Sequence, residues 1–425
     1  MKISAVIGAQ YGDEGKGLVT DYLSDEKSLV VRFNGGSQAG HTVTTPEGTR
    51  HVFSHFGSGT LNGGKTFLSK FFIANPFNFF LEYGDLNGKG VDNNLLRVFI
   101  DPRCIITTPY DIMINQAREE KLGHGSCGQG INETVVRSEN FAFNFTMAAI
   151  SNWSISDIKT RLKKIRDVYV PMRLSEQGIT LSDKMEEHLY NDNILLNFMS
   201  YCDFLEENSI VSTFDDKFFE GKDFDHVVFE GAQGLKLDEN HPKNFPHVTR
   251  SSTGIKNVLE LVEDANLEGP IDAYYLTRSY TTRHGAGPLP GELDKPPYAN
   301  VKDDTNIHNE HQGSLRFAPL DLWDIFEEVD RDLSKITGTH VRTRIKKHLV
   351  ITCMDQLDTP GVFKIHFKPD CPPWNPEPEL YTTENSLEQI MKEIRIYGFN
   401  NILLSYGPTR NTMEHYTYGW SKVTS

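Results

Sequence analysis

The stretch Ile3-Ser-Ala-Val-Ile-Gly-Ala-Gln-Tyr-Gly-Asp-Glu-Gly-Lys-Gly17 decides the fold of this 425-residue chain. Residues 3–9 form a short apolar run that predicts a buried strand of a parallel sheet. A glycine-rich turn follows, and residues 16–23 are expected to form a helix. A glycine-rich turn between a strand and a helix predicts a phosphate site, because backbone N–H groups and the helix N-terminus face the anion there.

The rest of the chain repeats this alternation of strands and helices. Short apolar runs predict strands at 28–33, 226–230, 271–276, 348–353 and 401–405. Helical patterns lie at 155–167, 185–207, 254–264, 321–335 and 385–396. The alternation predicts an α/β fold with a doubly wound, mostly parallel central sheet and helical and hairpin elaborations. We expect a single domain over 1–425, with the proline-rich stretch 368–378 as a surface connection.

The glycine loop departs from a standard Walker A motif in two ways. Gly17 stands where that motif carries the Ser or Thr that holds Mg²⁺. Asp13 places a carboxylate inside an anion-binding loop, where it repels phosphate unless it binds a metal or takes up a proton during chemistry. A simple NTPase switch is therefore a weak alternative.

A second glycine-rich turn, Gly35-Gly-Ser-Gln-Ala-Gly-His-Thr42, directly follows the second expected strand. His41 lies among small residues at a strand exit, where its side chain can reach a ligand. A lone histidine is more often structural, but the neighbouring phosphate loop favours a functional role here.

Composition limits the partners and the compartment. Lys plus Arg total 43 and Asp plus Glu total 58, so the net charge is −15, which argues against nucleic acid or an anionic membrane as a partner. The five cysteines form no C-x-x-C pair, which indicates free thiols in a reducing compartment. No signal peptide or membrane-spanning run is visible. We expect a cytoplasmic protein.

Six ordered blocks carry a family resemblance. They are 8–17 (GAQYGDEGKG), 35–42 (GGSQAGHT), 229–234 (FEGAQG) with the later Val248-Thr249, 280–288 (YTTRHGAGP), 352–358 (TCMDQLD) and 405–410 (SYGPTR). The chain thereby resembles the adenylosuccinate synthetase family, with Tyr11 and Gln38 where the family has Trp and Asn. The family couples L-aspartate to C6 of IMP through a 6-phosphoryl intermediate, driven by GTP or another NTP.

The resemblance implies catalytic roles for four residues. Asp13 would remove the N1 proton of the base, and Gln233 would orient the 6-oxygen and Asp13. His41 would stabilise the oxygen leaving the γ-phosphate, and Lys16 would neutralise phosphate charge. Mg²⁺ is the implied cofactor, beside Asp13 and the Gly40 carbonyl.

The resemblance also implies three sets of ligand-binding residues. The residues carried over for the NTP are Gly12, Glu14, Gly15, Lys16, Gly17, Gly40, Thr42, Asp355, Ser405, Gly407 and Pro408. Those for the purine monophosphate are Asp13, Gln38, Ser126, Cys127, Arg137, Gln233 and Thr249. Those for L-aspartate are Gly313, Ser314 and Arg316. Because the family's equivalent of Arg137 comes from a partner subunit, the resemblance also implies a homodimer.

The departures from the family cluster at the acceptor end. Ser126-Cys127 lies in an altered loop that is shorter before Arg137, and Cys353 replaces a lysine beside Asp355. An alternative is therefore the viral branch of this family, which uses dGMP with ATP or dATP to make the precursor of 2-aminoadenine nucleotides. A regulator that has lost catalysis is disfavoured, because Asp13, Lys16 and His41 all remain.

Overall fold

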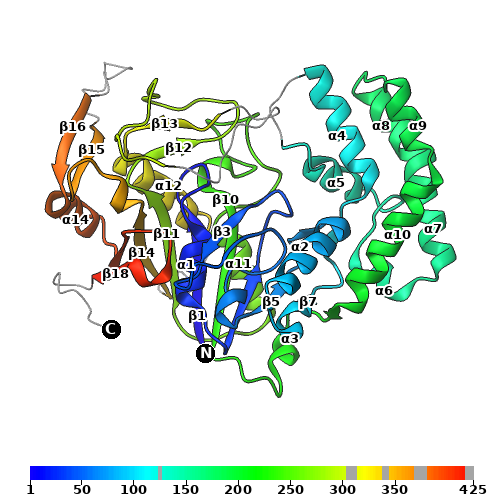
Figure 1. Ribbon diagram of the computed structural model, residues 1–425, viewed down its shortest axis with the longest axis horizontal. Coiled ribbons are helices and arrows are strands. Elements are labelled where there is room, and N and C mark those ends of the chain that lie inside the picture. The colour runs from blue at the N-terminus through cyan, green and yellow to red at the C-terminus, as the bar shows by residue number, and fades with distance from the viewer. Residues whose placement is uncertain (123–126, 303–313, 337–343, 368–380, 417–425) are drawn as a thin grey trace.

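A ten-stranded sheet runs through the centre of the molecule (Figure 1). The computed structural model describes residues 1–122, 127–302, 314–336, 344–367 and 381–416. In spatial order the strands are β18 (Met413–Tyr416), β17 (Asn401–Ser405), β14 (Ile345–Thr352), β11 (Ile271–Arg278), β1 (Lys2–Gly8), β10 (His226–Gly234), β2 (Ser28–Arg32), β5 (Lys65–Leu68), β7 (Val98–Ile100) and β9 (Ser209–Val211). Neighbouring strands are parallel, except that β18 is antiparallel to β17, which confirms the predicted α/β sheet.

Strand β1 is buried on both faces because its side chains alternate between two cores. Ile3, Ala5 and Ile7 join the cluster that includes Val258 of α11 (Ile255–Asp264). Val6 instead joins the cluster that includes Val19 of α1 (Lys16–Leu23). Helices therefore cover both faces of the sheet, as expected for a doubly wound fold.

Strand β10 lies between β1 and β2, although it comes much later in the chain than either of them. Ala5 pairs with Phe229, and Phe229 pairs in turn with Val31. The predicted strands at 3–9 and 28–33 are therefore not neighbours in the sheet, because a strand from the middle of the sequence lies between them. The insertion brings the ends of β1, β10 and β11 to one edge of the sheet, which is where ligands bind in open α/β sheets.

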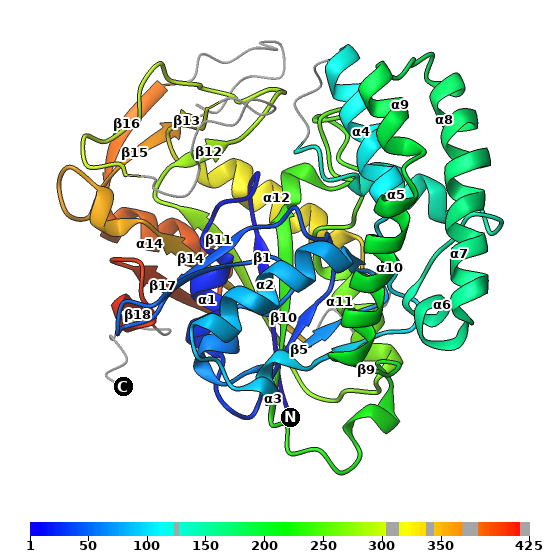
Figure 2. The same cartoon turned by 45° about the vertical axis from the view of Figure 1, so that its right-hand side comes forward.

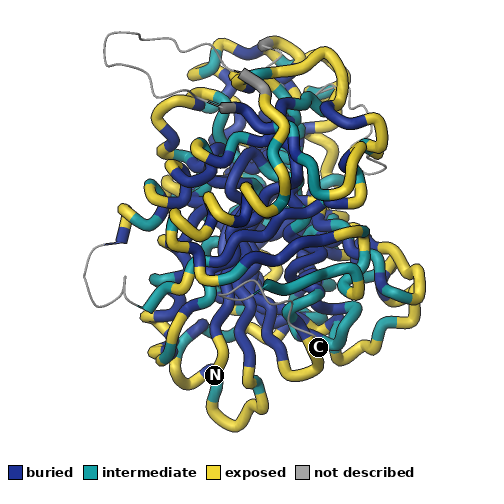
Figure 3. Tube along the Cα trace, turned by 90° about the vertical axis from the view of Figure 1, so that its left-hand side faces the viewer, coloured by how far each residue is buried: buried dark blue, intermediate teal, exposed yellow. Residues whose placement is uncertain are grey.

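A further hydrophobic core, separate from the two that β1 contacts, lies beside the sheet among helices that follow β5 and β7. These helices are α2 (Pro76–Gly88), α4 (Pro109–Leu122), α5 (Ile131–Ser138), α6 (Met147–Asn152), α7 (Ile155–Lys164), α8 (Val170–Glu176), α9 (Asp183–Leu189) and α10 (Asp192–Glu207). Figure 2 shows α4 and α7–α10 standing together at the side of the sheet. Figure 3 shows buried chain through the centre and exposed loops around it.

The expected helices are present, with two differences in continuity. The helix expected over 185–207 is two helices, α9 and α10, because the side chain of Asn191 accepts from Asn193 N and starts a new helix. The pattern at 155–167 is α7 followed by a π-helical turn over Ile165–Tyr169. The other three are α11, α12 (Leu322–Ser334) and α14 (Leu387–Ile396).

Two further expectations concern the chain as a whole. In the described part of the chain, no helix is long and apolar enough to cross a membrane. Cys104, Cys127, Cys202 and Cys353 are free thiols, as expected. The proline-rich stretch 368–378 lies outside the described residues.

Candidate active site

The phosphate loop follows β1 and is held in shape by the carboxylate of Glu14. Glu14 Oε1 accepts hydrogen bonds from Gly12 N at 2.8 Å and Gln10 N at 3.2 Å. Gly12 and Gly15 have φ of 105° and 91°, a region that favours glycine. A Cβ on Gly234 would lie 2.2 Å from the carbonyl oxygen of Gln10, so β10 packs directly against the loop.

Two residues from neighbouring strands fix the far side of the loop. At the end of β14, Thr352 Oγ1 donates to the carbonyl of Glu14 at 2.9 Å. At the end of β11, Arg278 Nε donates to the carbonyl of Asp13 at 2.6 Å. Both strands lie on one side of β1 in the sheet, whereas β10 packs against the loop from the other side.

Lys16 begins α1 and points back into the loop. It is buried, and its Nζ lies 2.5 Å from Glu14 Oε2. The resemblance places both Lys16 and Glu14 at the NTP. In the structure the Glu14 carboxylate is used by the loop itself, so only its backbone is free to serve a phosphate.

Asp13 and Gln233 are both held in the left-handed region of backbone conformation. Their φ values are 63° and 58°, which L-residues other than Asn and Asp seldom adopt. The two backbones lie near each other, since a Cβ on Gly12 would be 3.7 Å from Gln233 Cα. Among the described residues, the Asp13 carboxylate has no hydrogen-bond or ion-pair partner. The structure thus brings together two of the residues expected to be catalytic.

His41 opens β3 (His41–Thr44) and is paired with a carboxylate that the sequence did not single out. Its Nδ1 lies 2.7 Å from Oε1 of Glu230, in β10. Glu230 also accepts from Ser58 N at 3.0 Å and from the Ser58 hydroxyl, and Arg32 lies 3.9 Å away. This pairing makes Nδ1 the protonated nitrogen of a neutral His41 and leaves Nε2 for a ligand.

Burial shifts the pKa values of His41 and Glu230 in opposite directions. Burial lowers the pKa of His41 below its ordinary value, with Arg32 and Lys16 adding to the effect. Burial would raise the pKa of Glu230, but the charges of His41 and Arg32 and the hydrogen bond from Ser58 hold it below its usual range. Glu230 is therefore an ionised, buried hydrogen-bond acceptor.

Several buried polar atoms at this edge have no protein partner among the described residues. They are Ser37 Oγ, Thr42 Oγ1, Gln233 Oε1 and both amide atoms of Gln38. Gln38 Nε2 and Gln233 Oε1 lie 3.6 and 3.3 Å from the position of a Cβ on Gly35. Because buried polar groups are nearly always hydrogen-bonded, these atoms mark where the polar groups of a ligand belong.

The residues expected to contact the NTP base lie at the ends of β14 and β17. Asp355 is exposed in a short 3₁₀ turn over Met354–Gln356, which follows Cys353 with φ of 61°. Ser405 Oγ donates to the carbonyl of Gly407 at 2.8 Å, before Pro408. These ends share the sheet edge with the phosphate loop.

The residues expected at the acceptor and at L-aspartate are only partly described. Ser126 and Gly313 lie outside the described residues, whereas Cys127 is half-buried and Ser314 is exposed. Thr249 N donates to the carbonyl of Leu237 at 2.8 Å, just beyond β10. Arg316 opens β13 (Arg316–Ala318), opposite Arg283 of β12 (Thr281–Arg283).

Arg137 is held by contacts within its own chain, and its expected role in a partner's site stays a prediction. The side chain is fully buried, and its Nε and NH2 bind Asp111 at 2.8 and 3.0 Å. Its NH1 and NH2 also donate to the carbonyls of Phe143 and Ile106. A guanidinium held in this way stabilises the packing of its own chain.

Three residues at the site were missed by the sequence analysis: Glu230, Arg278 and Ser58. Glu230 lies inside the block 229–234, so the block itself was the available signal. Arg278 lies two residues before the block 280–288, and Ser58 lies in none. Their roles depend on contacts between distant parts of the chain.

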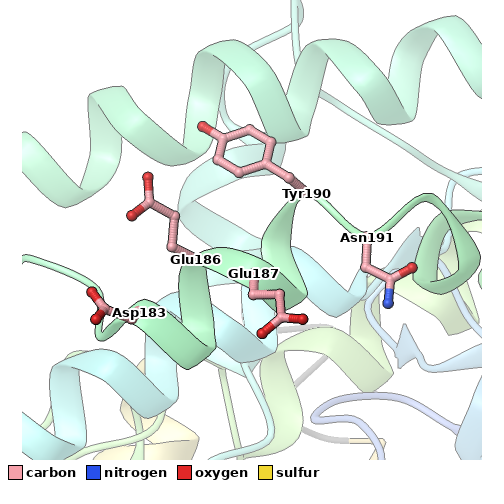
Figure 4. A pocket seen from close by; sticks show the side chains of 5 residues that line it. All are labelled: Asp183, Glu186, Glu187, Tyr190 and Asn191. Atoms are coloured by element: carbon pink, nitrogen blue, oxygen red, sulfur yellow. The ribbon is translucent and has the colours of Figure 1, made fainter.

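A pocket of about 610 Å³ lies away from this site, on α9. Figure 4 shows its lining side chains, Asp183, Glu186, Glu187, Tyr190 and Asn191. Three carboxylates and no cation line it, so it would repel nucleotide phosphates. We assign it no part in the site.

The fold and the site together define a nucleotide-binding α/β protein whose phosphate loop contains an acid. A model of the adenylosuccinate synthetase family matches residues 5–316. The adenylosuccinate synthetase of Nitratidesulfovibrio vulgaris is 31% identical over 297 residues, which cover 68% of this chain and 66% of that protein. The chain belongs to the adenylosuccinate synthetase family.

A second relative agrees with the first. The adenylosuccinate synthetase of Photobacterium profundum is 31% identical over 304 residues, which cover 68% of this chain and 64% of that protein. The matched part of the chain thus spans about two thirds of the length of these curated relatives.

Two solved structures share the fold across nearly the whole chain. A fully ligated adenylosuccinate synthetase from Plasmodium falciparum matches with a TM-score of 0.71 and 19% identity, over 97% of this chain and 99% of that one. The succinoaminodeoxyadenylate synthetase of cyanophage S-2L, bound to dGMP and dATP, matches with a TM-score of 0.59 and 12% identity, over 97% and 95%.

The residues at the loop fit the Mg²⁺ that the family implies. The free carboxylate of Asp13 and the exposed backbone of Gly40 offer oxygen ligands, which this hard cation prefers. Mg²⁺ commonly takes one or two protein ligands and completes its shell with phosphates and water. Two oxygen donors of this kind match the number of protein ligands that Mg²⁺ commonly takes.

Proposed function

We propose that this protein joins L-aspartate to C6 of IMP, driven by the hydrolysis of GTP or another NTP to NDP and phosphate. The observation that carries the proposal is the placement of Asp13. Its carboxylate is unpaired inside a phosphate loop, beside Gln233 and near the His41–Glu230 pair. Such a group suits proton abstraction from a base whose oxygen then attacks a phosphate.

The first step activates the 6-oxygen. Asp13 accepts the N1 proton, and the 6-oxygen attacks the γ-phosphorus while the NDP leaves. Lys16 and the N–H groups of the loop neutralise the transferring phosphoryl group. The negative charge of the triphosphate favours protonation of His41 at Nε2, and that proton stabilises the departing oxygen.

The second step forms the new bond. The amine of L-aspartate attacks C6 and loses a proton, and the 6-oxygen leaves with the phosphoryl group as inorganic phosphate, which takes up that proton. Arg316 holds a carboxylate of the incoming L-aspartate. Asp13 and the Gly40 carbonyl would hold Mg²⁺, which would supply further charge neutralisation at the phosphates.

The acceptor and the donor are tested together. Phosphate release is measured with L-aspartate while IMP and dGMP are crossed against GTP and ATP. Turnover with IMP and GTP is the expected result, because Asp13 is retained in the loop. Turnover with dGMP and ATP alone would contradict it and would assign the altered acceptor loop to dGMP. Nucleotide hydrolysis without any acceptor would leave only an NTPase.

We also propose that the protein is a cytoplasmic homodimer. Four free thiols support a reducing compartment. Apolar side chains exposed on α2, namely Phe77, Phe80 and Leu81, offer area for a subunit contact. Arg137 lends no support, since it is buried within its own chain. A monomer in sedimentation at micromolar concentration would contradict the dimer.

A further inference from the structure

The side chain of Arg316 is already paired with a carboxylate of the protein itself, that of Glu292. Its Nε donates to Oε1 of Glu292 at 2.7 Å, and its NH2 donates to Oε2 of the same residue. This is the two-pronged geometry by which arginine binds carboxylates in ligands. Arg316 holds the pKa of Glu292 below its usual range, so the carboxylate is ionised at neutral pH.

The guanidinium is fixed from the other side by backbone. Its NH1 donates to the carbonyls of Gly285 at 3.1 Å and Gly287 at 2.8 Å. Those contacts do not involve Glu292. The carboxylate-binding edge of Arg316 thus stays in place whichever carboxylate occupies it.

Arg316 also lies close to the phosphate loop. It pairs directly with Arg283 across β12 and β13, and opposite residues in antiparallel strands share one face. The Arg283 guanidinium lies 4.5 Å from the ring centroid of Tyr11, which precedes Gly12 in the loop. Two cations thus share a face next to the loop, and Glu292 neutralises one of them.

The pair of Arg137 and Asp111 serves as a comparison, because it is an arginine–carboxylate pair that is closed to solvent. The side chains of Arg137 and Asp111 are both 0% exposed. The side chains of Arg316 and Glu292 are 26% and 43% exposed. Water reaches the second pair and replaces lost contacts at little cost, so Glu292 can swing away.

We propose that Glu292 is an internal stand-in for the substrate carboxylate: it occupies Arg316 in the free enzyme and must be displaced before L-aspartate binds. This inference rests on the proposed function. It makes Glu292 a residue that sets the affinity for the amino acid. Removing its charge frees the carboxylate-binding edge of Arg316 for an incoming dicarboxylate.

The test is Glu292→Gln, with the KM for L-aspartate as the readout. The expected result is roughly a two- to five-fold lower KM for L-aspartate, the range of an exposed ion pair, with kcat and the nucleotide KM unchanged. Glu292→Asp, whose shorter side chain weakens the pair, shifts KM in the same direction by less. A raised or unchanged KM for L-aspartate in Glu292→Gln overturns the proposal.

The matched control is Glu260→Gln. Glu260 is 46% exposed and pairs with Lys70, away from β13. Its loss removes one surface ion pair and one charge but leaves Arg316 untouched, so KM for L-aspartate stays at the wild-type value. A lower KM in this variant would assign the effect to net charge and overturn the proposal.

A binding measurement separates this inference from the proposed function. If the wild-type protein shows no turnover with any acceptor, the proposed function is wrong. Calorimetry with succinate, a dicarboxylate without the amine, then still decides the role of Glu292. Tighter succinate binding by Glu292→Gln than by wild type supports the proposal. Equal affinity, or binding by neither protein, overturns it.

Discussion

Three residues at the strand ends keep a backbone conformation that most side chains avoid. Asp13, Gln233 and Cys353 have φ values of 63°, 58° and 61°, and each follows or ends a central strand. Such strain persists only where surrounding contacts impose it, and it gathers at functional sites. The strained backbone at these positions costs conformational stability and fixes the direction of particular side chains.

Gln233 allows that strain to be separated from chemistry. Gln233→Gly and Gln233→Ala both remove the amide and should lower kcat about 100-fold. The glycine variant should be about 1 kcal/mol more stable to unfolding than the alanine variant, because only glycine accepts positive φ freely. Denaturant titration and steady-state kinetics measure both effects. Equal stabilities would show that the backbone relaxes at this position.

Substitution of Arg137 separates a role within its own chain from the predicted role in a partner's site. Arg137→Ala leaves the buried Asp111 carboxylate without its partner, so the free energy of unfolding should fall by about 3–5 kcal/mol. Arg250→Ala breaks an exposed pair with Glu139 and should cost less than about 1 kcal/mol. A stable Arg137→Ala protein with a raised KM for the purine monophosphate would instead support the partner-site role.

At the scale of elements, one helix is capped by a side chain from another. Asp332 of α12 accepts from Ile255 N, at the start of α11, with both carboxylate oxygens at 3.0 Å. Tyr275 donates its hydroxyl to the same carboxylate at 3.0 Å. Gly254, the N-cap residue, offers no side chain of its own. The cap therefore joins α11, α12 and β11.

Asp332 predicts a pH dependence of stability. Burial raises its pKa from 3.8 to about 6. The folded state therefore holds a proton that the unfolded state releases between about pH 4 and 6, and stability falls as pH rises through that window. The loss is about 3 kcal/mol at most. Asp332→Asn keeps an acceptor without the charge, so its unfolding free energy should lack this loss between about pH 4 and 7. An identical pH profile in both proteins would contradict the assignment.

The elements also show what sequence can and cannot predict. The phosphate loop was predictable because one short stretch contains its strand, its glycines and its helix. The strands β5, β7 and β9 were not predicted, since strands of three or four residues are too short to show a period. The pairing of His41 with Glu230 joins positions 189 residues apart, and the place of β10 between β1 and β2 has no local signature.

At the scale of the whole molecule, two hydrophobic cores share the same strands. Phe67 and Phe99 face the core of the sheet, whereas their neighbours Leu68 and Ile100 face the core among the helices. The period-2 alternation of β5 and β7 thus ties both cores to one set of backbone hydrogen bonds. Neither core can lose its strands without opening the other.

We propose on this basis that residues 1–425 behave as one cooperative unit. Thermal unfolding should show one transition, at the same midpoint by far-ultraviolet circular dichroism and by tyrosine and tryptophan fluorescence. Leu68→Ala should lower that single midpoint without splitting it, because its cavity weakens a strand that both cores use. Two resolved transitions in either protein would assign the helical part to a separate domain.

The position of β10 has a consequence for synthesis on the ribosome. The strand that leads into the phosphate loop pairs with residues 226–234, so it emerges long before that neighbour exists. At translation rates of about 5–20 residues per second, the gap is on the order of ten to fifty seconds. During that time an apolar strand edge is exposed in the nascent chain. The opposite edge of β1 stays unpaired for longer still, because its neighbour β11 is synthesised after β10.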